Sequence, residues 1–263
     1  ELPTAYDYIR LGHPLSCLLE WVIAKINNIK PKNVISFSSK TIPILAILRK
    51  NLLSNKSTQI VFTDELPKFI DFKILKNIYG YKFDLKKVEK VEDISAFNGS
   101  TVFISQQDEI SNIPLKLDID FFINFHSQFG SILLVNGQKN ESYISEIQHV
   151  RRRETISMTP VNCLANLNSI INKSTFKNNK NNTESDKKLL LESIADITGT
   201  NTKAVVGSSG LSIQYAIMMG LIHDALENHK RKAIRFIVPP NCYGGTNDQA
   251  RRVAACIDNV EVI

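Results

Sequence analysis

Apolar and polar residues follow two different periods along the first half of the chain. Short apolar runs rich in β-branched and aromatic residues are typical of buried strands, and apolar positions three and four apart are typical of amphipathic helices. The expected strands are 34–37, 59–63, 101–105 and 131–135, and the expected helices are 16–27, 41–53, 69–78 and 119–128. Because the two kinds alternate, we expect an α/β fold, a mainly parallel sheet with helices on both faces.

A polar segment then interrupts this pattern. Residues 173–188 are rich in lysine and asparagine and contain little that could be buried, so they predict a linker. Beyond them the apolar runs 204–206 and 234–238 each predict a strand that stops at small residues and leads into a helix. The expected organisation is a domain over 1–172, a linker over 173–188, and the first part of a second α/β domain over 189–263.

The residues after the linker repeat an earlier part of the chain. With one gap, 18–26 resemble 189–197, 38–40 fall on 208–210, and 60–62 fall on 236–238. Any two βαβ units share some of this likeness, but order, spacing and a Ser-Ser pair agree together. We interpret this as an internal duplication, in which 16–62 should superpose on 187–238 with two helices and two strands in the same order.

Two turns of the second part carry the candidate chemistry. Ser208, Ser209, Gly210 and Leu211 follow one predicted strand and open a helix, and Tyr243 stands before two glycines after the other strand. Free amides at a helix N-terminus attract anions, and an aromatic ring on a glycine hinge suits a flat ligand. Together they predict a site for a planar, phosphorylated cofactor. The alternatives are an ordinary strand-to-helix turn and a half-buried loop tyrosine.

Composition narrows the classes of protein. The 263 residues are 43% hydrophobic, which is ample for a core, and the net charge of +6 comes largely from dispersed lysine. This argues against a nucleic-acid partner; the one dense basic run, 151–153, predicts a solvated helix face or an interface salt-bridge cluster. The four cysteines and five histidines show no metal spacing, and no apolar run reaches about 18 residues. We therefore expect a reduced, cytoplasmic protein with neither a metal nor a membrane span.

Three segments resemble one family. They are Tyr8-Ile9-Arg10-Leu11-Gly12-His13-Pro14, Ser208-Ser209-Gly210-Leu211 and Tyr243-Gly244-Gly245-Thr246. At these residues the chain resembles the Cys/Met-metabolism, or trans-sulfuration, family of pyridoxal-phosphate-dependent enzymes, which have an aminotransferase-like fold of type I. The match is specific from about 189 onward and loose from 8 to about 140.

The resemblance implies a cofactor, pyridoxal 5′-phosphate, and roles for the matching residues. Ser208, Ser209, Gly210 and Leu211 would bind its phosphate, and Tyr243 would stack on its ring and move protons as the catalytic residue. Tyr8 and Arg10 would reach a phosphate from a neighbouring subunit, which implies a homo-oligomer or a partner chain that completes the site. The alternative for this last pair is a surface segment near a frayed terminus.

The departures from the family are equally informative. Lys40 stands where the family has glycine, Pro67 stands near the place of its tyrosine, and Asn136 stands where it has aspartate. An amide cannot stabilise a protonated pyridine nitrogen as a carboxylate does. The first half thus resembles a copy that has lost its cofactor. The second half reaches residue 263 before the family's aspartate and lysine positions, so we expect a fragment of a longer enzyme that is inactive alone.

The function implied is that of a lyase or transferase. The full protein would catalyse β- or γ-elimination or replacement on an amino acid substrate such as cysteine, cystathionine or an activated homoserine. The alternative is a non-catalytic scaffold or regulatory subunit with a degenerate aminotransferase-like fold. A nucleotide-binding Rossmann protein is a weaker third reading, because no G-x-G-x-x-G follows the first predicted strand.

Overall fold

The computed structural model describes residues 9–109, 113, 115–173, 183–200, 202–230 and 232–263. Tyr8 and residues 174–182 of the predicted linker lie outside the described residues, and the last part of the predicted linker, 183–188, is helical in the structure. We call the described residues up to 173 the first unit and those from 183 onward the second unit.

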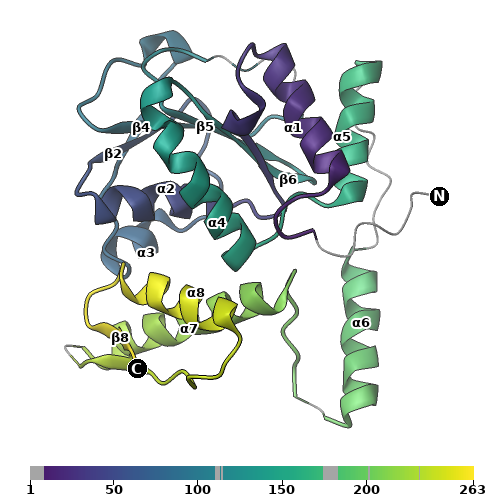
Figure 1. Ribbon diagram of the computed structural model, residues 1–263, viewed down its shortest axis with the longest axis vertical. Helices are drawn as coiled ribbons and strands as arrows, with labels where there is room; N and C mark the ends of the chain where they lie inside the picture. Colours follow the sequence, from purple (N-terminus) through teal and green to yellow (C-terminus); the bar gives the residue numbers. More distant parts are fainter. Residues whose placement is uncertain (1–8, 110–112, 114, 174–182, 201, 231) are drawn as a thin grey trace.

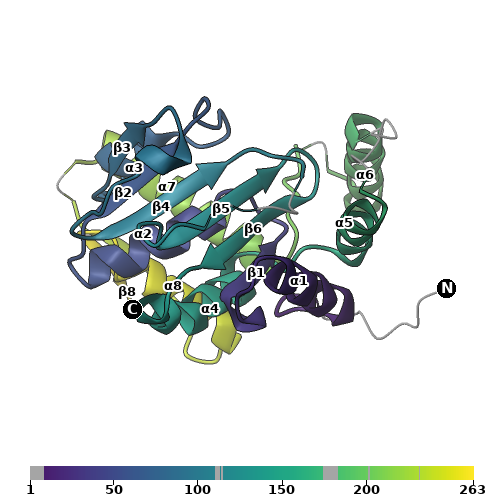
Figure 2. The ribbon, with the colours of Figure 1, turned by 90° about the horizontal axis from the view of Figure 1, so that it is seen from above.

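A six-stranded sheet with the order β1-β6-β5-β4-β2-β3 forms the centre of the first unit (Figures 1 and 2). Strands β2 to β5 pair in parallel, whereas β6 runs antiparallel to both β5 and β1. The prediction of a mainly parallel sheet is therefore confirmed, with one reversed strand. The strands are β1 (Val34–Phe37), β2 (Thr58–Phe62), β3 (Asp84–Lys87), β4 (Ser100–Ser105), β5 (Phe121–His126) and β6 (Gly130–Val135).

Helices cover both faces of this sheet, as predicted (Figure 2). On β4, Val102 and Ile104 belong to one core cluster and Phe103 to another, because successive side chains point to opposite faces. Burial on both faces explains why the strands read as continuous apolar runs. The helices are α1 (Pro14–Ile26), α2 (Ile42–Leu53), α3 (Phe72–Asn77), α4 (Ile144–Glu154) and α5 (Pro160–Asn172), with short 3₁₀ turns η1 (Pro31–Asn33), η2 (Val91–Asp93) and η3 (Gln138–Tyr143).

The second unit packs two of its helices onto the first (Figure 1). Tyr215 and Val253 belong to the same core cluster as Ile147 of α4, so the two units share one hydrophobic core. Helix α6 instead stands away from the sheet, with Leu189 and Ile197 exposed. The elements are α6 (Thr183–Thr198), α7 (Gly210–Asn228), β7 (Ile234–Phe236), α8 (Gly244–Ala254) and β8 (Val260–Val262).

Two predicted elements are wrong. Residues 119–128 were expected to be helical, but β5 lies there with every residue buried between β4 and β6, because its aromatic residues favour a fully buried strand. Residues 204–206 were expected to be a strand, yet they form no strand hydrogen bonds with any described segment, and Val205 is exposed. The corresponding strand β1 is paired by β6, and no described strand lies beside 204–206.

The two units share an order of elements that is consistent with the predicted internal duplication. The segment β2-α3-β3 of the first unit has the same order as β7-α8-β8 of the second unit, and in each segment the two strands pair in parallel and are connected by the helix. The two strands begin 26 residues apart in both units, at 58 and 84 and at 234 and 260. Helices α6 and α7 correspond to α1 and α2, so the counterpart of β1 is the one element of the predicted superposition that is lacking from the described part of the second unit.

Candidate functional site

Helix α7 begins at the first predicted turn. Ser209 is its N-cap: the Ser209 side chain accepts a hydrogen bond from the amide of Ser212 at 3.1 Å, and the Ser212 hydroxyl accepts one from the amide of Ser209 at 2.9 Å. The amides of Gly210 and Leu211 have no acceptor among the residues that the structure describes. Because a helix cannot satisfy its own first amides, these two groups and the helix dipole remain available to an anion.

Helix α8 begins at the second predicted turn, directly after Tyr243. Tyr243 is the N-cap but makes no side-chain cap, and its ring is 57% exposed. A Cβ atom at Gly245 would overlap this ring and would lie 2.8 Å from the guanidinium of Arg153. Any other residue at position 245 would therefore make the Tyr243 ring and the Arg153 guanidinium move from these positions.

The two turns lie side by side. Gln249 of α8 is fully buried and donates to the carbonyl oxygens of Leu211, at 2.8 Å, and Arg153, at 2.6 Å. Gln214 of α7 donates to the carbonyl oxygen of Thr246 at 3.1 Å. These bonds fix the first turn of α7 against α8 and against the end of α4. The structure thus brings together Ser208 to Leu211 and the α8 turn that carries Tyr243.

An arginine from the first unit completes this arrangement. The Arg10 guanidinium donates to the Tyr243 hydroxyl at 3.2 Å. The hydrogen bond and the charge of Arg10, with a smaller contribution from Arg153, lower the pKa of the Tyr243 phenol. Arg10 and Tyr243 were predicted separately, from opposite ends of the sequence, and the structure places them in contact. Tyr8, predicted with them, is outside the described residues.

The corresponding turn of the first unit is arranged differently. The Ser39 hydroxyl accepts from the amides of Thr41 and Ile42, at 3.3 and 3.2 Å. The amino group of Lys40 donates to the carbonyl oxygen of Ser127 at 2.7 Å and lies 5.4 Å from the centre of the Phe69 ring. Burial lowers the pKa of Lys40, although Asp108 opposes this. Lys40 therefore crosses from this turn to the hairpin between β5 and β6.

The position proposed for an acidic residue in the first unit needs correction. Asn136 follows β6, and because β6 is antiparallel, Asn136 lies at the sheet edge opposite the carboxyl ends of the parallel strands. Its amide group donates to the carbonyl oxygens of Lys116 and Ile119 at 2.8 and 2.7 Å. One carboxylate at the carboxyl ends of the parallel strands is that of Asp108, which follows β4 and accepts from the Ser127 amide at 2.8 Å. An acidic residue soon after a buried strand was the signal that the sequence reasoning missed.

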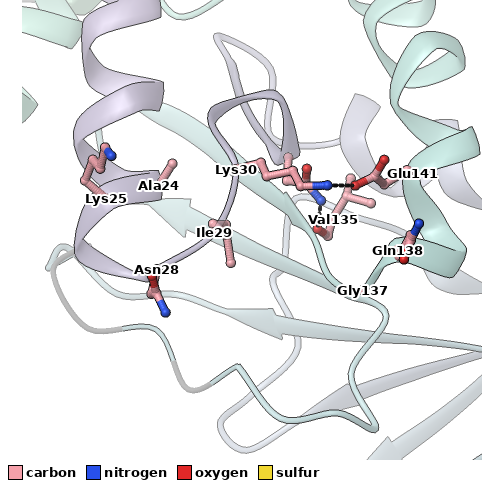
Figure 3. Close-up of a pocket in the computed structure, with 10 residues that line it drawn as sticks. Ala24, Lys25, Asn28, Ile29, Lys30, Val135, Gly137, Gln138 and Glu141 are labelled. Carbon is pink, nitrogen blue, oxygen red and sulfur yellow. Dashed lines mark hydrogen bonds and ion pairs between the residues drawn. The ribbon is translucent and has the colours of Figure 1, made fainter.

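The three cavities that we describe lie away from these turns. One, of about 480 Å³, lies between the end of α1 and η3, where Lys30 and Glu141 form an ion pair of 2.9 Å (Figure 3). A second, of about 470 Å³, lies between α2, α4 and α8, and an apolar third, of about 240 Å³, lies between α2, α3 and α7. None is lined by residues 208–211 or by Tyr243. Around Gly210 the space is open, since a Cβ atom there would meet no atom within 4 Å.

Two other kinds of site are lacking from the described part of the chain. Its helices include none that is both long and apolar enough to cross a membrane. Its histidine, cysteine, aspartate and glutamate side chains nowhere form a group of three that could hold a metal ion.

Comparisons with known proteins gave structural neighbours alone. No protein-family model and no curated protein matches the sequence. The fold is similar to metB from Corynebacterium glutamicum (15% identity, 65% of this chain and 55% of that one, TM-score 0.44). It is also similar to cystathionine gamma synthase from Xanthomonas oryzae pv. oryzae (12%, 64% and 53%, 0.44) and to a putative L-allo-threonine aldolase from Listeria monocytogenes (13%, 66% and 62%, 0.42). This chain spans a little over half the length of the first two.

Proposed function

We propose that this chain is part of a pyridoxal-phosphate-dependent enzyme of sulfur amino acid metabolism, a lyase or transferase acting at the β or γ carbon of its substrate. One observation carries the proposal: helix α7, whose first two amides have no acceptor among the described residues, packs against the start of helix α8, where an exposed tyrosine accepts a hydrogen bond from an arginine of the other unit. This combination offers phosphate donors and a ring surface in one place.

The residues at the two turns fit this cofactor. The amides of Gly210 and Leu211 and the hydroxyl of Ser208 would hold its phosphate, and the open space at Gly210 leaves room for it. The Tyr243 ring would stack on the cofactor ring, and its phenol would take up or release a proton at lower pH than a free tyrosine, because Arg10 lowers its pKa. When bound, the cofactor supplies an electron sink for the reaction.

The first unit would act as a structural partner to this site. Its own turn is crossed by Lys40, whereas its Arg10 contacts Tyr243 of the second unit. In this arrangement the first unit would supply to the second unit, within one chain, the contact that the family receives from a neighbouring subunit. It also favours the second candidate, a scaffold or regulatory subunit, for the first unit taken alone.

A substitution at Gly210 tests the proposed phosphate site. The probe is pyridoxine 5′-phosphate, which has the ring and the phosphate but no aldehyde to react with surface lysines. By calorimetry the unmodified chain should bind it, and Gly210→Val should bind about tenfold more weakly, because the new side chain enters the space before the amides. The fold should persist, since no atom lies within 4 Å of the new Cβ.

Gly220→Val is the matched control. Gly220 lies on the same helix, also has open space at its Cβ, and is exposed. Its affinity for the probe should equal that of the unmodified chain. Equal binding by the Gly210 and Gly220 variants, or no binding by the unmodified chain, contradicts the proposal.

A further inference from the structure

A cavity at the junction of the two units carries an excess of positive charge. It measures about 470 Å³ and is formed by α2 and α4 of the first unit and α8 of the second. Four basic side chains line it, with two acidic ones, and these six are Arg49, Lys50, Arg251, Arg252, Glu146 and Asp248. Its size is that of a small-molecule site.

The acidic groups of this cavity are already neutralised. Glu146 pairs with Arg252, and Asp248 pairs with Arg153, at 2.9 Å, and with His149. Lys50 and Arg251, in contrast, form no ion pair with any residue in the described ranges. The lining therefore keeps two positive charges that the protein does not balance.

Two buried N–H groups of arginines that line this cavity have no acceptor among the residues that the structure describes. They are the Nε groups of Arg49 and Arg252, and Arg49 is only 3% exposed. A buried charged donor without an acceptor destabilises the folded protein more than a neutral one does. In native proteins a ligand or a water molecule usually accepts its hydrogen bond. These groups thus point to a missing acceptor.

The guanidinium groups also repel each other. Burial lowers the pKa of Arg252, and the positive charge of Arg49 lowers it further. An anion near both would offset this repulsion as well as accept their hydrogen bonds.

We propose that this cavity binds the phosphate group or groups of a small anionic metabolite and thereby links the two units. Arginine forks suit phosphate, whose several oxygens can accept from more than one donor, and a dianion matches the two unbalanced charges. The cavity is lined by neither Tyr243 nor residues 208–211, and its nearest lining residue on α8, Asp248, lies four residues beyond Gly244, which is about 6 Å along the axis of α8.

Calorimetry with pyrophosphate as the probe tests the proposal on the full chain. The double variant Lys50→Gln/Arg251→Gln should bind pyrophosphate about tenfold more weakly than the unmodified chain. The matched control Lys232→Gln/Arg235→Gln removes the same charge from exposed positions at β7 and should bind normally. The Lys50→Gln/Arg251→Gln variant should still bind pyridoxine 5′-phosphate as the unmodified chain does, which distinguishes this cavity from the proposed cofactor site.

A charge introduced at an exposed position provides an independent variant. Leu53 lines the cavity and is 58% exposed, so Leu53→Glu should leave the fold intact and weaken pyrophosphate binding. Pyrophosphate at a concentration that raises the thermal unfolding midpoint of the unmodified chain by about 3 °C should raise that of either cavity variant by less. The proposal is overturned if the unmodified chain does not bind, if both cavity variants bind normally, or if the control loses as much affinity as they do.

Discussion

Glu154→Ala should lower the free energy of unfolding by about 3–5 kcal/mol, because it leaves the Arg49 guanidinium buried without its counter-ion. Arg49 and Glu154 pair through two hydrogen bonds, and their side chains are 3% and 0% exposed. Arg49 also donates to the Tyr215 hydroxyl at 3.3 Å, so the pair reaches from α2 and α4 to α7 of the second unit. Urea denaturation measures the loss, and its effect should extend to the contact between the units.

Two further variants serve as controls for this result. Tyr215→Phe keeps the ring and removes one acceptor, so it should cost only about 1 kcal/mol. Glu227→Ala breaks an exposed pair with His223 on α7 and should cost less than about 1 kcal/mol. If Glu154→Ala lowers the free energy of unfolding no more than Glu227→Ala does, the Arg49–Glu154 pair does not stabilise the junction between the units as the structure implies.

Gly130→Ala should destabilise the first unit by about 3 kcal/mol or more, through backbone strain and overlap together. Gly130 begins β6 with φ +98°, and a Cβ atom there would overlap the carbonyl oxygen of Phe37 and lie 2.9 Å from that of Ser38. Both oxygens belong to the backbone, at the last residue of β1 and the residue after it, so they cannot rotate away as a side chain could. Thermal unfolding followed by circular dichroism measures the effect.

Gly80→Ala separates strain from overlap. Gly80 also has a positive φ, +71°, but a Cβ atom there would meet nothing within 4 Å. It should therefore cost only about 1 kcal/mol. Equal losses for the two variants would show that the close approach of Gly130 to β1 has no energetic weight.

The apolar strands and the capped helices could be predicted from sequence because their signals are local. Strand β4 and helix α2 lie within a residue of their expected positions, since a buried run or an amphipathic stripe identifies each. Strand β3 gave no such signal, because it is an edge strand with polar residues that are mostly exposed. Its pairing with β2 could be known only from the assembled sheet.

The basic run on α4 shows how tertiary contacts decide between open alternatives. The sequence allowed a solvated helix face or an interface cluster. In the structure Arg151 is buried and pairs with Glu20 at 2.8 Å, and Arg153 pairs with Asp248 of the second unit at 2.9 Å. The run is therefore an interface cluster, and nothing in its local composition distinguishes the two cases.

Likewise, only the local features of the candidate site could be predicted from the sequence. The turn at Ser209 and the glycines after Tyr243 could be recognised locally, and helices begin there as expected. The contact of Arg10 with Tyr243 spans 233 positions and depends on the packing of α7 and α8 against α4. The position expected for the acidic residue was wrong because the direction of β6 cannot be read from its apolar pattern.

The central claim is that residues of both units form one cofactor-binding site at Tyr243, and Arg10→Gln tests it most directly. The unmodified chain and Arg235→Gln, whose arginine pairs with Glu261 at the surface, should bind pyridoxine 5′-phosphate equally in calorimetry. Arg10→Gln should bind about tenfold more weakly, and the pKa of Tyr243 should rise toward that of a free tyrosine as the hydrogen bond is lost. Unchanged affinity in Arg10→Gln would contradict a site shared between the two units.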